Sequence, residues 1–187
     1  MFSYEDVCFN PIEEGDLEEL RELRNEQSTW MNLTTIGQIT QAQQKSWFDK
    51  LESDASQSYY MACEVVREFP MEYVGDKLGV VRIDCIDRTN KNCRIGCDVF
   101  PVKRGNSWGT KIFNATLKFC FDYLNMHMVH LMVLDSNEIA KRIYCNAGFS
   151  YLGSLPEAVY RNGKYIDYHI MAITKNVYEN LKHTKRK

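Results

Sequence analysis

The chain has 187 residues, a length typical of one domain, with 44% hydrophobic and 26% charged residues and a formal net charge of −2. This composition is ordinary for a globular protein, and it excludes a general nucleic-acid-binding protein, which would be strongly basic. No run of about 18 apolar residues occurs, so we expect no membrane span. The first residues are acidic and do not predict a signal peptide, so we expect a cytoplasmic protein.

The seven cysteines lack the paired spacing of a metal site or a disulfide framework. Cys93 and Cys97 lie four residues apart on a predicted strand, with no second pair and no histidine nearby, so we expect no metal site. Reduced thiols, most of them small core residues, fit the pattern better.

The N-terminal third predicts one strand and two helices. A strand is expected at 2–9 before Asn10-Pro11. Leucines at 17, 20 and 23 predict a helix over 13–25, and Thr40 is expected to cap a second helix that ends near residue 51. The polar stretch 26–39 predicts a loop. Within it, Trp30 and Met31 are candidate substrate-lining residues, with core plugging as the alternative.

The middle of the chain predicts a meander followed by a crossover. Strands at 58–66, 78–86 and 93–99, with a connection at 69–76, indicate an antiparallel meander. An amphipathic helix is expected over 108–124 and an apolar strand over 128–134. Strands 93–99 and 128–134 are therefore expected to be parallel, because a helix joins them.

The C-terminal part predicts a short helix from 137 to about 146, with Asp135 or Ser136 as its cap and Asp135 with Glu138 as a capping box. Gly148 is placed to end it. Two last strands are expected at 151–160 and 165–173, joined by a tight turn at Asn162-Gly163. We expect one domain over 1–175 and a solvated basic tail over 176–187.

The chain is organised around the turn between strand 93–99 and the helix that follows. A helix N-terminus after a glycine-containing turn offers N–H groups without intrahelical partners and about half a positive charge. Lys103 and Arg104 add full charges. We therefore predict that a pyrophosphate binds here, with an ordinary strand-to-helix turn as the alternative. The stretch is Arg104-Gly105-Asn106-Ser107-Trp108-Gly109-Thr110.

Two common phosphate loops do not fit this stretch, because it lacks the Walker A spacing and has Ser107 where the dinucleotide fingerprint needs glycine. It resembles the acetyl-CoA loop of the GNAT N-acetyltransferase superfamily: Arg or Gln, two residues, Gly, one residue, Gly or Ala. Arg104, Ser107 and Gly109 occupy the fixed places. Ser107 departs from the usual glycine, and phosphate binding through its N–H is expected if its φ is negative.

A second segment strengthens the resemblance, because it carries the GNAT pattern of Asn, Ala three residues on, Tyr four further on, and then Gly-Phe. The matching residues are Asn137, Ala140, Tyr144, Gly148 and Phe149. The region with Trp30 and Trp47-Phe48 and the ending 161–167 resemble the branch with ribosomal-protein N-terminal, spermidine and pseudaminic-pathway amino-sugar acetyltransferases. The resemblance implies a single mixed α/β domain with about seven strands, four helices and a central parallel pair that splays apart.

The resemblance also implies where CoA binds. A helix from Asn137 places residues 137, 140, 141 and 144 on one face, so Asn137 and Lys141 can face the cofactor arm and Tyr144 the thioester. The pantetheine is expected to pair with backbone groups between the splayed strands. The predicted cofactor-binding set is Val99, Phe100, Val102, residues 104–110, Asn137, Ala140, Lys141 and Tyr144.

The implied chemistry is direct attack of a neutral primary amine on the thioester, with oxyanion donors from the backbone of 95–100. Tyr144 is the predicted catalytic residue. A phenol with a pKa of about 10 is a weaker acid than a thiol near 8.5, so proton transfer to the thiolate is concerted with bond breaking, or Tyr144 only hydrogen-bonds the sulfur. A half-buried structural aromatic is the alternative. The general base stays open: the candidate carboxylates are Asp84, also a candidate substrate-binding residue, Glu64 and Asp98.

The sequence thus predicts an acetyl-CoA-dependent N-acetyltransferase for a small or exposed primary amine. The Trp30 and Trp47 pattern favours an amino-sugar nucleotide, with a protein N-terminus or a polyamine as alternatives. A non-catalytic acyl-CoA-binding sensor is the alternative of another class, since Met132 stands where some relatives carry glutamate. No nucleic-acid or membrane partner is expected, and relatives make a homodimer possible.

Overall fold

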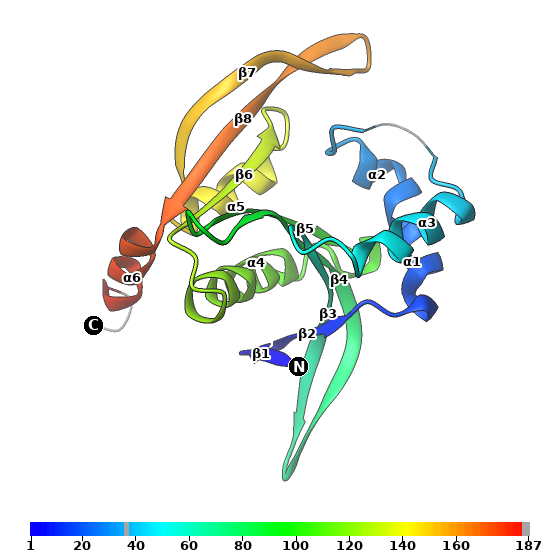
Figure 1. Ribbon diagram of the computed structural model, residues 1–187, viewed down its shortest axis with the longest axis vertical. Helices are drawn as coiled ribbons and strands as arrows, with labels where there is room; N and C mark the ends of the chain where they lie inside the picture. The colour runs from blue at the N-terminus through cyan, green and yellow to red at the C-terminus, as the bar shows by residue number, and fades with distance from the viewer. Residues whose placement is uncertain (36–37, 185–187) are drawn as a thin grey trace.

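The computed structural model describes residues 1–35 and 38–184. One mixed sheet runs through the molecule in the order β1-β2-β3-β4-β5-β6-β8-β7 (Figure 1). All neighbouring strands are antiparallel except β5 and β6, which are parallel. The strands are β1 Phe2–Tyr4, β2 Val7–Pro11, β3 Ser58–Glu68, β4 Met71–Asp87, β5 Asn92–Val99, β6 Met128–Leu134, β7 Ser150–Arg161 and β8 Lys164–Thr174.

Helices cover both faces of this sheet. A hydrophobic core on one face joins α4 and α5 to the central strands, and a second core on the other face joins α1 to β2, β3 and β4. In the described residues the helices are α1 Leu17–Asn25, α2 Gln27–Trp30, α3 Gln41–Leu51, α4 Trp108–Lys118, α5 Glu138–Asn146 and α6 Lys175–Thr184. In the described part of the chain, no helix is both long and apolar enough to cross a membrane.

The parallel pair splays apart, as the family resemblance implies. β5 and β6 pair only at Asn92 with Met128, Cys93 with Val129 and Arg94 with His130. Beyond these pairs β5 continues to residue 99 beside β4, and β6 continues to residue 134 beside β8. The edge of β5 that faces β6 therefore has no strand partner over residues 95–99.

The single mixed α/β domain is confirmed, but the number of elements is higher than predicted. The segment 2–9 forms the hairpin β1–β2, because Glu5 takes a positive φ of 51° and reverses the chain. The stretch 69–76, expected as a connection, is mostly strand, since Met71 pairs with Glu68 and Val74 with Val65. Pairing to β3 outweighs the turn signals of Pro70 and Gly75.

Helices α2 and α6 were also missed. The stretch 26–39 is not all loop: Glu26 caps α2 by accepting a hydrogen bond from Thr29 N at 3.0 Å. Residues 176–184 are not a solvated tail, because α6 stacks Tyr178 on Phe121 with ring centroids 4.7 Å apart. A helix held by one or two tertiary contacts leaves little periodic signal in the sequence.

The remaining elements agree closely with the sequence. The predicted helix 108–124 is α4 followed by a π-helical turn, η3 Phe119–Tyr123. The β7–β8 hairpin turns at Asn162 and Gly163, whose φ angles of 48° and 80° are those of the expected tight turn.

Candidate active site

The loop between β5 and α4 presents backbone N–H groups. One 3₁₀ turn, η2 Pro101–Lys103, follows β5, and α4 begins at Trp108. Within the described residues, the N–H groups of 105–110 donate to no protein acceptor, whereas Lys111 N reaches Ser107 O at 3.1 Å. Unpaired donors at a helix N-terminus suit a diphosphate, so these residues fit the cofactor that the sequence implies.

Ser107 does not have the negative φ on which phosphate binding through its N–H was expected to depend. Its φ is 61° and its ψ is 4°, the left-handed conformation in which glycine is usual. The loop therefore keeps the backbone shape that a glycine would give it, and its N–H groups stay accessible at the cost of local strain.

The two cations of the loop are engaged elsewhere. The guanidinium of Arg104 donates to Val99 O at 3.0 Å, to Thr29 Oγ1 at 2.6 Å and to Ser28 Oγ. Lys103 Nζ lies 2.5 Å from Asp76 Oδ2. Arg104 thus ties the loop to α2, and the positive potential over the loop comes chiefly from the N–H groups.

Two of the backbone groups predicted to pair with the pantetheine are also taken. Phe100 N donates to Leu78 O at 2.9 Å, and Val99 O accepts from Arg104. Val102 is exposed. The rest of this edge of β5, over residues 95–98, has no strand partner and offers further backbone groups.

The start of α5 differs from the predicted capping box. Asn137 is the N-cap, and its Oδ1 accepts a hydrogen bond from Ala140 N at 3.1 Å. Asp135 pairs instead with Lys141, whose Nζ lies 2.7 Å from Asp135 Oδ1 and 2.8 Å from Glu138 Oε1. The motif asparagine therefore fixes the helix start, and Lys141 is neutralised beside it.

Tyr144 of α5 packs against α4. Its ring centroid is 4.8 Å from that of Phe113 on α4 and 6.1 Å from that of Phe149. Burial raises the pKa of Tyr144 well above its usual value, and the neighbouring Cys97 and Asp98 of β5 add to this. The phenol is therefore fully protonated at neutral pH.

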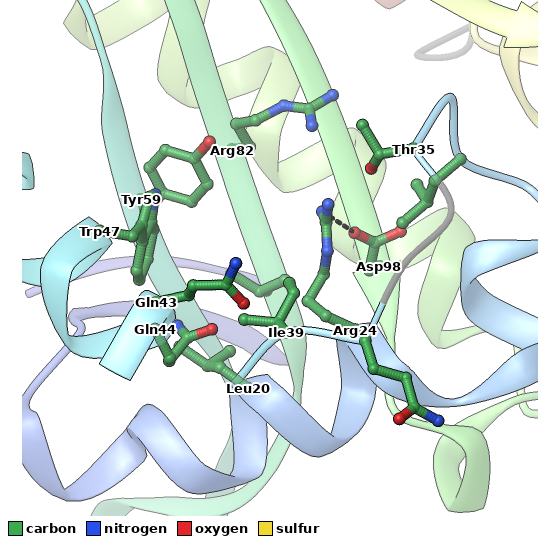
Figure 2. Close-up of a pocket in the computed structure, with 13 residues that line it drawn as sticks. Leu20, Arg24, Thr35, Ile39, Gln43, Gln44, Trp47, Tyr59, Arg82 and Asp98 are labelled. Atoms are coloured by element: carbon green, nitrogen blue, oxygen red, sulfur yellow. Dashed lines mark ion pairs between the residues drawn. The ribbon is translucent and has the colours of Figure 1, made fainter. Parts of the chain in front are cut away.

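A cavity of about 480 Å³ lies on the opposite face of β5. Cys97 points toward α4, where its Sγ is 3.6 Å from Thr116 Oγ1, so Asp98 points the other way. Figure 2 shows Trp47 and Tyr59 forming one wall, with rings 5.0 Å apart, and Arg24 reaching Asp98 on the other. The lining residues are Leu20, Arg24, Leu33, Thr35, Gln38, Ile39, Gln43, Gln44, Trp47, Tyr59, Val80, Arg82 and Asp98.

The predicted substrate residues do not line this cavity. Trp30 ends α2 and Met31 follows it. Asp84 is 8% exposed and is held between two guanidiniums: Arg94 Nε is 2.6 Å from its Oδ1, and Arg82 Nε is 3.0 Å from its Oδ2.

Of the three carboxylates proposed as a general base, Asp98 lines the cavity and Asp84 and Glu64 do not. The sequence did not identify Arg24 and Arg82 as cavity residues. Successive side chains of a strand point to opposite faces, so this alternation along β4 could have placed Arg82 on the cavity face. No local signal marks Arg24.

Comparison with known proteins decides the family. The model of the acetyltransferase (GNAT) domain matches residues 6–150. The chain belongs to the GNAT acetyltransferase family. It is an acetyl-CoA-dependent N-acetyltransferase.

The family assignment agrees with the curated relatives. Spermidine N(1)-acetyltransferase of Escherichia coli K12 is 26% identical over 178 residues, which cover 95% of this chain and 91% of that protein. Spermidine N(1)-acetyltransferase of Vibrio cholerae is 27% identical over 178 residues, which cover 93% of this chain and 96% of the relative.

Solved structures show the same fold. Spermidine N-acetyltransferase from Vibrio cholerae in complex with CoA and spermine has a TM-score of 0.85 at 21% identity, covering 95% of this chain and 100% of that one. A dodecameric structure of that protein in an intermediate state has a TM-score of 0.78 at 22% identity, covering 95% and 99%.

Proposed function

We propose that the acceptor amine enters the cavity between α1, α3 and the sheet and attacks a thioester held in the splay between β5 and β6. The observation that carries the proposal is the position of Asp98. This residue lines the cavity and belongs to the stretch of β5 whose other edge is free. An amine beside Asp98 would therefore be close to a thioester seated along that edge.

Each step uses residues already described. Bound acetyl-CoA supplies the acetyl thioester. The free N–H groups of 105–110 would hold its diphosphate, and the unpaired edge of β5 would orient the arm in the manner of an added strand. A backbone N–H of that edge is also available to stabilise charge on the thioester oxygen.

Two side chains would handle protons. A primary amine must lose its proton before attack, because its pKa lies well above 7, and Asp98 is placed to accept that proton directly or through water. Tyr144 keeps its proton at neutral pH and would hydrogen-bond the departing sulfur. The same buried phenol is too weak an acid to release a free proton, so transfer would accompany bond breaking.

A thiol-release assay tests the proposal. Acetyl-CoA is incubated with a panel of primary amines, and free CoA thiol is measured over time. We expect release that depends on both enzyme and amine, with an acetylated amine as product. Saturable binding of acetyl-CoA without turnover for any amine would contradict the proposal and favour the sensor alternative.

The identity of the acceptor is a finer question. The relatives are named for spermidine, so a polyamine is the first acceptor to assay. The amino-sugar nucleotide favoured by the sequence has no support from these comparisons and belongs in the same panel as a second candidate.

Self-association is also proposed for this chain. β7 lies at the edge of the sheet and exposes Tyr151, Leu152 and Leu155, and an unpaired apolar edge is a common site of pairing with another chain. A homodimer or larger assembly would appear as an increased mass in sedimentation experiments.

A further inference from the structure

The candidate acceptor cavity has an excess of guanidinium groups over carboxylates. We propose that its acceptor is a primary amine that also carries an anionic group, a carboxylate or a phosphate, rather than a polyamine. This inference rests on the proposed function, because it names the substrate class of the same cavity.

The first observation is the charge of the lining. Arg24 and Arg82 both line the cavity, and among the described lining residues Asp98 is the only carboxylate. Arg24 Nη1 lies 4.0 Å from Asp98 Oδ2, so this carboxylate already pairs with a cation (Figure 2). A polyamine would bring several further positive charges to this surface, where like charges repel.

The second observation is the fixed position of Arg82. Its guanidinium lies over Gly96, where an added Cβ would come within 2.6 Å of Arg82 Nη2. Its Nε is buried and makes no well-aligned hydrogen bond within the described residues, although Asp84 Oδ2 is 3.0 Å away. Asp84 is held mainly by Arg94, through two hydrogen bonds. Arg82 is therefore only partly satisfied and has its terminal nitrogens beside the cavity.

The third observation is Arg161, at the end of β7. This residue is 5% exposed, and its guanidinium donates to Tyr160 O at 2.7 Å and to Leu33 O. Leu33 is itself a lining residue of the cavity. Within the described chain, Arg161 Nε has no hydrogen-bond partner and no carboxylate lies within ion-pair distance of this guanidinium.

A buried cation without an anion is costly, and an anionic ligand near Leu33 would compensate it. Two guanidiniums, from α1 and β4, thus line the cavity beside one carboxylate, Asp98. A third, Arg161 of β7, lies behind the lining residue Leu33, to whose backbone oxygen it donates. A ligand with an ammonium at one end and an anion at the other matches this distribution.

Matched acceptors test the inference on the unmodified protein. 4-Aminobutanoate and 1,4-diaminobutane have the same carbon chain and differ in the second group, and glucosamine 6-phosphate and glucosamine differ by the phosphate. We expect kcat/KM to be at least tenfold higher for the anionic member of at least one pair. The pair that responds distinguishes a carboxylate from a phosphate. Equal values in both pairs, or a preference for the diamine, would overturn the inference.

Binding measurements keep this test separate from the proposed function. Calorimetry in the presence of CoA compares the affinities of the same pairs without requiring turnover. Tighter binding of the anionic members without acetylation would contradict the proposed function and leave the inference standing. Acetylation with a preference for spermidine would support the proposed function and overturn the inference.

A charge variant adds a second readout. Arg24→Gln should lower kcat/KM for the anionic acceptor about tenfold, while the value for 1,4-diaminobutane stays the same or rises. Arg88→Gln is the matched control, because Arg88 is exposed in the turn between β4 and β5, at the opposite end of β5 from Asp98. An equal loss for both acceptors in Arg24→Gln would show that Arg24 does not select charge.

Discussion

Ser107 shows how one residue can break a motif and keep its geometry. The left-handed conformation at φ 61° costs a non-glycine residue about 1–2 kcal/mol. The loop nevertheless adopts it, because α4 packs through Ile112 and Phe113 into the core and so fixes where the helix begins. The sequence pattern predicts the loop, but not that its serine is strained.

The strain predicts a stabilising substitution. Ser107→Gly should raise the free energy of unfolding by about 1 kcal/mol, because glycine adopts positive φ without penalty. Urea denaturation measures the change. Ser46→Gly, on the exposed face of α3, is the control and should destabilise by about 0.5 kcal/mol, since glycine is less favourable than serine inside a helix. A destabilised Ser107→Gly variant would argue against the strain.

Tyr144 carries the next prediction at this scale. Tyr144→Phe should lower kcat by about 10²–10⁴ if the phenol serves the leaving thiolate, while the Kd of CoA changes little. Single-turnover kinetics and calorimetry measure the two quantities. An unchanged kcat would remove Tyr144 from the mechanism and leave it as a packing residue against Phe113.

The same residue makes a prediction about pH. Burial raises the pKa of Tyr144 above the ordinary value of about 10, so the proton that it donates is still present at pH 10. We therefore expect no alkaline loss of kcat between pH 7 and 10 that is due to Tyr144. A loss of kcat near pH 9 in the native enzyme that is absent from Tyr144→Phe would contradict the raised pKa.

At the scale of elements, α5 is held at both ends by motif residues. Asn137 caps its N-terminus through Ala140 N, and Gly148 follows its C-terminus with a φ of 95°. An added Cβ at Gly148 would lie 2.3 Å from Leu181 Cδ1 of α6. Glycine is thus required at position 148 both for the positive φ and for the close approach of α6. The sequence predicts only the first requirement.

This contact gives a double-mutant test. Gly148→Ala should destabilise the protein by about 1–3 kcal/mol, from backbone strain and the clash with Leu181. Leu181→Ala should relieve the clash, so the two losses measured together should be smaller than their sum. Thermal unfolding of the four proteins measures the coupling. Strict additivity would show that the clash does not contribute.

Arg104 joins the loop between β5 and α4 to helix α2. Arg104→Ala should lower the free energy of unfolding by about 1 kcal/mol, because it removes hydrogen bonds to Val99, Ser28 and Thr29. We expect the Kd of CoA to rise less than tenfold. A rise of about a hundredfold with unchanged stability would make Arg104 a direct phosphate ligand, as the sequence suggests.

At the scale of the whole molecule, the splay interrupts strand pairing in the middle of the sheet. β5 over 95–99 has strand partners on one side only. A ligand that binds only the folded state stabilises it by about 2.7 kcal/mol at a hundred times its Kd. We expect CoA to raise the melting temperature and to slow amide exchange at 95–99 and 105–110 more than elsewhere. Uniform protection, or protection confined to other segments, would place CoA elsewhere.

The sequence by itself determined the parallel pair, the amphipathic α4, the loop at 104–110 and the helix that carries Tyr144. These features rest on local signals, namely the period of apolar residues, turn residues and spaced motifs, which act over a few neighbouring positions. The strand 71–76 and helix α6 were missed because pairing with β3 and packing on Phe121 decide them, and neither partner is local.

Only the tertiary structure decided the cavity that we propose for the acceptor. Arg24, Trp47, Arg82 and Asp98 come from four different elements, and the fold alone brings them to one space. The same is true of Arg104, whose charge is turned toward α2 by Ser28 and Thr29. The sequence shows that a residue is charged, but not which way its side chain points. Which partner it meets depends on how the sheet and helices pack, and that packing sets the chemistry of the site.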